Sequence, residues 1–340
     1  MGKGLNRLKY FGYIKFRNLK YFLKGLISKD NKKRFKDALK SSPRKVSYGM
    51  ENKDKTFYVA RRFSQVEGHC SLLMTMLGHC NRAIEMGMIP VIDMQNYYSE
   101  LWQDETRKGK DNAWEYFYEQ PGGYTLPDIS RSKNILLSDG VHARKAPSYR
   151  TTFDSETKIS FWHEIYKKHI HFNIETKKCV SEIKKKFLFS QGKILAVSVR
   201  RGIEWGHKIN DEGFKCHLKV PDFETIITDA KKLKKEWGCD KIFLVIDDEE
   251  GLERFKFEFP NEVLYVERDR RKYFINGLPN PGAEKDFVMS EQIYDREVKY
   301  LAEVMCIAEC SSFLGTKSST SLASMIIKGS RFKNLQLYGE

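Results

Sequence analysis

Two continuous apolar runs in the second half of the chain do most to restrict its possible folds. The first is KILAVSVR, residues 193–200, and the second is KIFLVID, residues 241–247. A strand that is apolar at nearly every position is typical of a parallel sheet with both faces covered. Residues 222–237, between the two runs, have the apolar spacing of a helix. The sequence therefore predicts a strand, a crossover helix and a parallel strand.

The same alternation recurs along the chain. Residues 56–62 and 88–94 are predicted strands on either side of a helix over 70–87, which ends at Gly87, a suitable C-cap residue. We expect a loop and helix insertion over 97–135, a helical stretch over 160–187, a helix over 250–257, a strand over 262–268 and a helix over 295–309. The pattern predicts an α/β protein with two doubly wound, Rossmann-like domains, residues 51–187 and 188–340, which face each other across a cleft.

The N-terminal segment carries most of the net charge. Residues 1–45 contribute +13 of the net charge of +15. Residues 1–28 combine apolar residues at helical spacing with basic residues on another face, so we expect a basic amphipathic arm over residues 1–50. Such a helix can lie on an anionic membrane or dock on its own domain, and the sequence leaves both open. No apolar run is long enough to span a bilayer.

The seven cysteines are scattered and show no paired CxxC spacing. This usage fits a reduced, cytoplasmic setting. Cys306 and Cys310 lie one helical turn apart in an apolar stretch, so we expect them in the core and expect no metal site there.

Two adjacent arginines, Arg200 and Arg201, follow the first apolar run directly. Ligands of open parallel sheets bind outside the carboxyl ends of the strands. Guanidinium groups match phosphate oxygens and can stabilise the charge of a departing diphosphate. The alternative is an ordinary pair of surface arginines at the start of a loop.

A second group that fits phosphate is GTKSSTSLA, residues 315–323, which follows a strand and opens a helix. Its hydroxyl and backbone N–H groups can hold phosphate at the helix N-terminus. Ser318 or Ser319 acting only as an N-cap is compatible with this role. Glu303 is predicted to be buried, where its carboxylate could accept hydrogen bonds from guanine or simply pair with a lysine.

These residues resemble the α-1,6-fucosyltransferases, the nodulation fucosyltransferase among them, and more loosely the O-fucosyltransferases. The resemblance covers about the last 150 residues and is carried by VSVRRGIEWG, FLVIDD and AECSSFLGTKSSTSLASMI. The loop at Gly68 and the following helix resemble the acceptor-side half of the same family. The family resemblance implies a GT-B-like fold and an inverting transfer of fucose from GDP-fucose without a metal ion or other cofactor.

The resemblance also implies roles for individual residues. Arg200 and Arg201 would contact the diphosphate, Glu303 would read guanine, and the donor site would further include Gly68, Ser198, Asp247, Asp248, Thr316, Ser318 and Ser319. Ser198 stands where the family has a histidine, and Lys208 where the animal enzymes have the proposed base. The general base stays unassigned, with Glu204, His207, Asp211 and Glu212 as candidates close in sequence.

The favoured hypothesis is a transferase of fucose or a close GDP-sugar to a glycan acceptor, in the assembly of lipopolysaccharide, capsule or another glycoconjugate. The acceptor would be lipid-linked if the enzyme lies on the cytoplasmic face of a membrane through residues 1–28. One alternative is a GT-B enzyme with another donor, such as a UDP-sugar. A non-enzymatic alternative is a nucleic-acid or anionic-surface binding module that acts through the basic arm, although the chain has no recognised nucleic-acid motif.

Overall fold

The computed structural model describes residues 43–61, 68–96, 101, 109–139, 145–148, 151–187, 192–199, 221–270, 274–275, 278–279 and 293–339. The basic arm over residues 1–28 and the segment 200–220, which holds Arg200, Arg201, Glu204 and His207, lie outside these residues. Among the described residues, no helix combines the length and the apolar character that a membrane span needs.

The first of two main sheets has the strand order β1-β4-β2-β3. β2 pairs in parallel with β3 and β4, whereas β1 pairs antiparallel with β4 at the edge. Helix α3 follows β2. The elements of this half are β1 (Arg44–Val46), β2 (Phe57–Arg61), α3 (His69–Glu85), β3 (Ile89–Asp93), the 3-10 helix η2 (Ala113–Tyr116), β4 (Ile135–Leu137), α4 (Glu156–His169) and α5 (Ile174–Lys185).

The second sheet is entirely parallel and has the order β11-β10-β5-β6-β7. A separate antiparallel pair, β8 (Phe274–Ile275) with β9 (Leu278–Pro279), follows it in the chain. The other elements are β5 (Ile194–Val199), α7 (Phe223–Glu236), β6 (Lys241–Ile246), α8 (Glu249–Glu258), β7 (Val263–Leu264), α10 (Ile293–Glu309), β10 (Ser312–Thr316), α11 (Ser319–Lys328) and β11 (Asn334–Tyr338).

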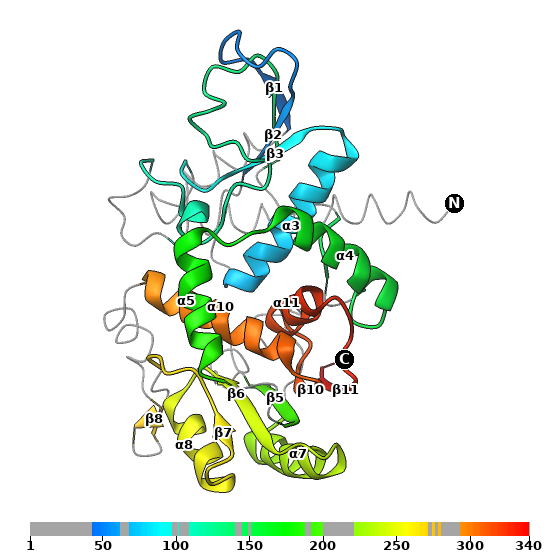
Figure 1. Ribbon diagram of the computed structural model, residues 1–340, viewed down its shortest axis with the longest axis vertical. Coiled ribbons are helices and arrows are strands. Elements are labelled where there is room, and N and C mark those ends of the chain that lie inside the picture. Colours follow the sequence, from blue (N-terminus) through cyan, green and yellow to red (C-terminus); the bar gives the residue numbers. More distant parts are fainter. Residues whose placement is uncertain are drawn as a thin grey trace, which may run out of the picture.

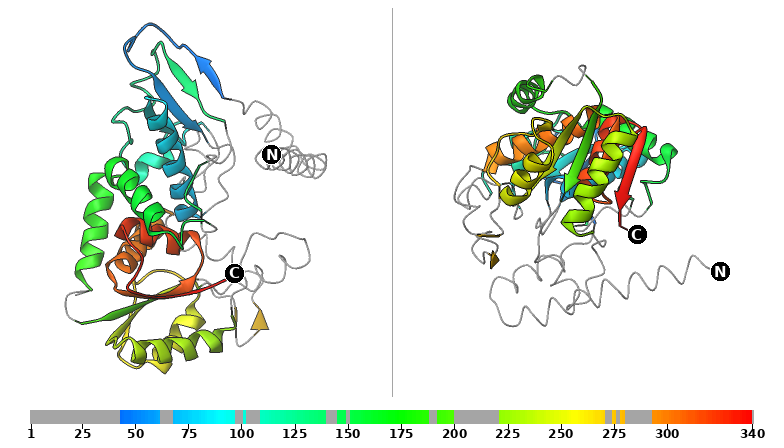
Figure 2. Two further views of the ribbon diagram at one scale, coloured as in Figure 1. Left: turned by 90° about the vertical axis from the view of Figure 1, so that its right-hand side faces the viewer. Right: turned by 90° about the horizontal axis from the view of Figure 1, so that it is seen from below.

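The main hydrophobic core lies between the two sheets. It joins Ile92 of the first sheet, residues of α3, α10 and α11, and Phe243 and Phe313 of the second sheet. Figure 1 shows these helices between the sheets, and the side view in Figure 2 shows the same order. A separate core packs the opposite face of the second sheet against α7 and α8. The second sheet is therefore covered by helices on both faces, as its apolar strands predict.

The first sheet is covered differently in the part of the chain that the structure describes. α3 packs on one face, and the other face packs against Val46 and the loop residues Tyr124, Leu126 and Ile129. The mixed α/β architecture with parallel sheets is confirmed. The sequence did not anticipate β1, which lies inside the range expected for the arm, nor β4 or β11. All three are short or partly exposed strands with weak apolar periodicity.

The shared core predicts the effect of a single truncation. Phe313 is fully buried and its ring lies 4.9 Å from that of Phe332, so Phe313→Ala should lower the free energy of unfolding by about 3–5 kcal/mol. Phe257→Ala removes a phenylalanine that is 76% exposed and should change it by less than about 0.5 kcal/mol. Urea denaturation measures both. Equal effects of the two variants would contradict the packing described.

Candidate active site at the junction of the two halves

The winding of the second sheet reverses between β5 and β10. From β5 the chain proceeds to β6 and β7 on one side, then returns to place β10 and β11 on the other. Ser198 of β5 lies between Gly315 of β10 and Val245 of β6, so the carboxyl ends of these three strands lie side by side. A crevice at such a reversal is where open α/β sheets bind ligands. Arg200, Asp247 and Lys317 each follow one of these strand ends in sequence.

The N-terminus of α11 lies at this edge. Ser318 is its N-cap and accepts a hydrogen bond from the N–H of Ser321 at 3.3 Å. The Ser321 hydroxyl donates to the carbonyl of Thr316 at 2.6 Å, which ties the first turn to the end of β10. The N–H groups of Ser319 and Thr320 lie in the first turn, where no helical carbonyl can accept from them. Ser318 thus takes its capping role, and the neighbouring N–H groups remain suited to an anion.

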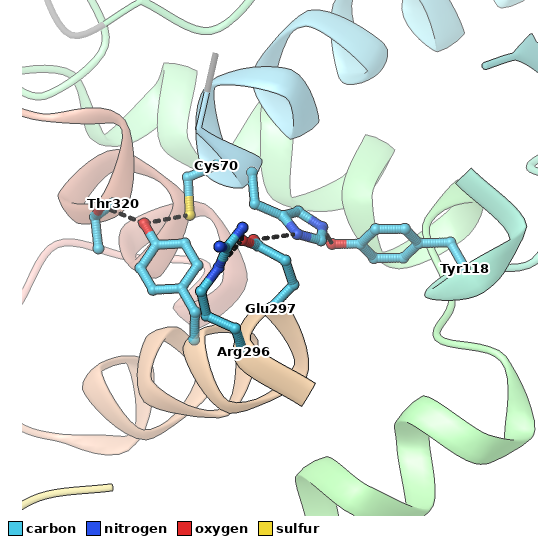
Figure 3. Close-up of polar contacts among 7 residues, drawn as sticks. Cys70, Tyr118, Arg296, Glu297 and Thr320 are labelled. Atoms are coloured by element: carbon cyan, nitrogen blue, oxygen red, sulfur yellow. Dashed lines mark hydrogen bonds and ion pairs between the residues drawn. The ribbon is translucent and has the colours of Figure 1, made fainter. Parts of the chain in front are cut away.

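The N-terminus of α3 meets that of α11 through one tyrosine. The hydroxyl of Tyr300, on α10, donates to Sγ of Cys70 at 3.3 Å and lies 2.6 Å from Oγ1 of Thr320 (Figure 3). Burial raises the pKa of the Cys70 thiol to about 12, so this thiol stays protonated. Its sulfur accepts the hydrogen bond from Tyr300. Gly68, the N-cap of α3, makes no side-chain cap and precedes Cys70 by two residues. The structure thus brings Gly68 close to the first turn of α11.

A second buried connection joins α3 to α10 beside the first. Nδ1 of His69 lies 3.1 Å from Oε2 of Glu297, and Nε2 of His69 lies 3.0 Å from the hydroxyl of Tyr118 (Figure 3). Arg296 donates to the other oxygen of Glu297 at 3.0 and 3.1 Å. Burial raises the pKa of Glu297, but the hydrogen bond with His69 and the charge and hydrogen bonds of Arg296 outweigh it and lower that pKa below 4.5.

The two helices that meet here differ from their neighbours in charge. Neither α3 nor α11 has an acidic residue in its first turn, whereas α4, α5, α7, α8 and α10 each have at least one. A carboxylate in the first turn usually compensates the positive end of a helix. The first turn of α11 is left without this compensation. At α3 the carboxylate of Glu297, from α10, contacts His69 and is itself paired with Arg296. The N-terminus of α11 is therefore the end at the junction that favours an anion.

Two acidic residues expected at the donor site, Asp248 and Glu303, make structural contacts. Asp248 is 1% exposed and caps α8, where it accepts from the N–H of Gly251 at 2.8 Å. Glu303 is fully buried, and Arg268 donates from Nε to its Oε1 at 2.9 Å. Arg268 also donates to the carbonyl of Ile246, the last residue of β6, at 3.1 Å. Glu303 therefore takes the pairing role that the sequence left open, with an arginine in place of a lysine.

A second arginine, Arg270, lies 3.9 Å from Oε1 of Glu303. Burial lowers the pKa of Arg268, but the carboxylate of Glu303 raises it more, so Arg268 stays charged. Oε2 of Glu303 is buried and has no hydrogen-bond partner among the described residues. A role in reading guanine would use this oxygen.

Sequence reasoning missed His69, Tyr118, Glu297, Tyr300 and Arg268. Glu297 and Tyr300 are three residues apart on one face of α10, a spacing that in sequence looks like any amphipathic helix. Their partners lie more than two hundred residues away, in the first half. Ser198, Thr316, Ser318 and Ser319 do lie at the carboxyl edge as expected, whereas Arg200, Arg201, Glu204 and His207 lie outside the described residues. Within the described part, no three acidic, cysteine or histidine side chains are placed to hold a metal ion.

Comparison with solved structures finds similar chains. One is the fucosyltransferase NodZ from Bradyrhizobium, with 14% identity, a TM-score of 0.47 and coverage of 81% of this chain and 93% of that one. The NodZ α-1,6-fucosyltransferase soaked with GDP-fucose has 15% identity, a TM-score of 0.48 and the same coverage. Arabidopsis thaliana FUT1 in complex with GDP has 10% identity, a TM-score of 0.44 and coverage of 87% of this chain and 73% of that one.

The NodZ structures are those of fucosyltransferases. They belong to the family whose motifs this sequence resembles. With TM-scores below 0.5, the similarity by itself assigns no activity to this chain. No family model matches the sequence, and no curated protein matches it.

The contact between His69 and Glu297 predicts how stability depends on pH. Because the pKa of Glu297 is lower in the folded protein than its ordinary 4.5, its contribution is present above pH 4.5 and is lost as the pH falls through the folded pKa. Glu297→Gln should lower the free energy of unfolding by about 1–3 kcal/mol at pH 7, and the loss should shrink below pH 4.5.

The control for this variant is Glu236→Gln, whose carboxylate is half exposed and lies 3.9 Å from Lys232. It should change stability by less than about 0.5 kcal/mol at either pH. Denaturation curves at pH 7 and pH 4 give both values. A pH-independent loss in Glu297→Gln would show that its charge does not stabilise the junction.

Proposed function

We propose that this protein is an inverting glycosyltransferase that transfers fucose, or a closely related sugar, from a GDP-sugar to a glycan acceptor. One observation carries the proposal. The N-termini of α3 and α11, both without acidic residues in the first turn, meet at the point where the winding of the parallel sheet reverses. A nucleoside diphosphate is the anion that this arrangement fits, because backbone N–H groups and helix dipoles act on it together.

The motif resemblance supplies the chemistry that this proposal adds to the anion site. The acceptor oxygen attacks the anomeric carbon on the face opposite the diphosphate and the bond to the diphosphate breaks. The acceptor proton passes to a general base. Arg200 and Arg201 are proposed to stabilise the departing diphosphate, and Glu204 and His207 are candidates for the base. The reaction is proposed to proceed without a metal ion or cofactor.

The cellular location of the enzyme and its lipid-linked acceptor are proposed from the charge pattern of residues 1–28 alone. The basic arm over residues 1–28 would hold the enzyme on the cytoplasmic, anionic face of a membrane, where a lipid-linked acceptor is available. Removal of residues 2–28 should then release the protein from anionic liposomes without loss of activity on a soluble acceptor. Unchanged binding to liposomes would favour an arm docked on the body of the protein.

The nucleotide is tested by ligand-induced thermal stabilisation of the purified full chain with GDP, UDP, ADP and GMP, each with and without magnesium. A ligand that binds only the folded state stabilises it by about 2.7 kcal/mol at 100 times its Kd. We expect GDP to raise the Tm without magnesium and the other nucleotides to raise it less. Stabilisation by UDP alone would indicate a UDP-sugar as the donor in place of a GDP-sugar. No stabilisation by any nucleotide would refute the proposal.

The arginine pair is tested by GDP release from GDP-fucose, with a glycan pool as acceptor. Arg201→Ala should lower kcat about 100-fold or more because a donor to the leaving group is lost. Arg331→Ala, an exposed arginine that precedes β11 at the opposite edge of the sheet, should leave kcat unchanged. Full activity in a folded Arg201→Ala protein would remove this residue from the mechanism.

A further inference from the structure

The first sheet carries a cavity that the junction does not use. It has a volume of about 320 Å³, within the range of small-molecule sites. It lies on the face of the sheet opposite α3, and Val59, Ile129 and Leu137 form part of an apolar wall. Asp93 and Leu137, which also line it, are the last residues of β3 and β4. The cavity therefore extends along this face, from Tyr48 and Ser130 near the amino end of β4 to the carboxyl ends of β3 and β4.

The carboxyl edge of the first sheet is the one directed at the second half of the protein (Figure 1). β2, β3 and β4 are parallel, so their carboxyl ends lie together. The chain after β2 leads to the N-terminus of α3, where Cys70 contacts Tyr300. The end of the cavity lined by Asp93 and Asn96 thus lies at the same edge of the first sheet as the junction, although the cavity and the junction lie on different faces of the sheet.

Three polar groups in the cavity are available to a ligand. Tyr48, Asn96 and Ser130 line it. The hydroxyls of Tyr48 and Ser130 and the Oδ1 of Asn96 make no hydrogen bond in the part of the chain that the structure describes. Tyr48 is also 53% exposed, so its side chain is accessible to a ligand. A hydroxyl-rich molecule can pair with all three groups.

The backbone near Tyr48 and Ser130 and the side chain of Asn96 are held by hydrogen bonds. The N–H of Tyr48 donates to the carbonyl of Ser132 at 3.0 Å, and the N–H of Glu51 donates to that of Arg131 at 3.0 Å, which fixes the Tyr48 segment against the loop that carries Ser130. Nδ2 of Asn96 donates to both carboxylate oxygens of Asp93 at 3.0 and 3.2 Å, which fixes the amide. The amide of Asn96 therefore needs little ordering on binding, and Tyr48 and Ser130 are brought together through their backbone.

The described wall of the cavity offers no cation to phosphate. Among its described lining residues there is no lysine or arginine, and the one acidic residue is the buried Asp93. Burial raises the pKa of Asp93, and the charge of Arg61, its partner in the sheet, offsets part of that rise. Arg61 is itself buried and is not one of these lining residues. A pyranose has an apolar C–H face for the aliphatic wall and hydroxyl groups for the polar side. Its size and chemistry suit this cavity.

We infer that the cavity lined by Tyr48, Asn96 and Ser130 binds one neutral pyranose unit of a saccharide. Its use for the acceptor glycan rests on the proposed function. Binding of the sugar itself does not depend on that function, because none of these residues takes part in the junction between α3 and α11.

The test is saturation-transfer NMR on the full chain with the methyl glycosides of glucose, galactose, mannose and N-acetylglucosamine. At least one should receive saturation from the protein. Tyr48→Ala should weaken its binding about five- to tenfold through loss of the ring, and Ser130→Ala about fivefold through loss of one hydrogen bond. Phe161→Ala removes an aromatic ring of similar exposure on α4 and should change nothing. The inference would be overturned if none of the four sugars received saturation. It would also be overturned if Tyr48→Ala bound the sugar as tightly as the unmodified protein.

The same variants separate this inference from the proposed function. Tyr48→Ala and Ser130→Ala should retain the Tm and the GDP-induced stabilisation of the unmodified protein. Sugar binding without GDP binding would keep the cavity and refute the transferase. GDP binding without sugar binding would keep the transferase and refute the cavity.

Discussion

The rest of the structure depends on the parallel pairing of β5 with two neighbours at once. β10 pairs with one side of β5 and β6 with the other, although β10 is more than a hundred residues away in the chain. This arrangement reverses the winding of the sheet and leaves three strand ends beside one another. It also sets α11 directly after β10, with its N-terminus at that edge. The candidate site is a consequence of this strand order rather than of any single residue.

The second constraint is that the same helices belong to both halves. α10 and α11 cover one face of the second sheet and share a continuous core with α3 of the first half. The polar contacts at the N-termini, from Tyr300 to Cys70 and Thr320 and from Glu297 to His69, are surrounded by this core. Buried hydrogen bonds of this kind are costly to break one at a time. They therefore fix the relative position of the two positive helix ends that a diphosphate would need.

Much of the second half could be predicted from the sequence, because continuous apolar strands and helical periodicity are local signals. The helices at 223–236 and 249–258 and the strands at 194–199 and 241–246 lie within a few residues of the expected ranges. The cap at Ser318 could also be predicted, since it depends on neighbouring residues, whereas Asp248 was expected at the donor site and caps α8 instead. The pairings of His69 with Glu297 and of Arg268 with Glu303 could not, because they join distant segments and carry no local pattern. β7 proved shorter than expected, and β1, β4 and β11 depend on pairing partners rather than on their own periodicity.

The central claim is that the acid-free first turn of α11 binds the diphosphate, and one calorimetric measurement tests it most directly. Ser319→Asp places a carboxylate in that turn, where it favours the helix by about 0.3–1 kcal/mol and repels an anion. Thr157→Asp makes the same change in the exposed first turn of α4. The account predicts at least about tenfold weaker GDP binding for Ser319→Asp, with an unchanged or higher Tm, and unaltered binding for Thr157→Asp. Equal GDP affinity in both variants would contradict it.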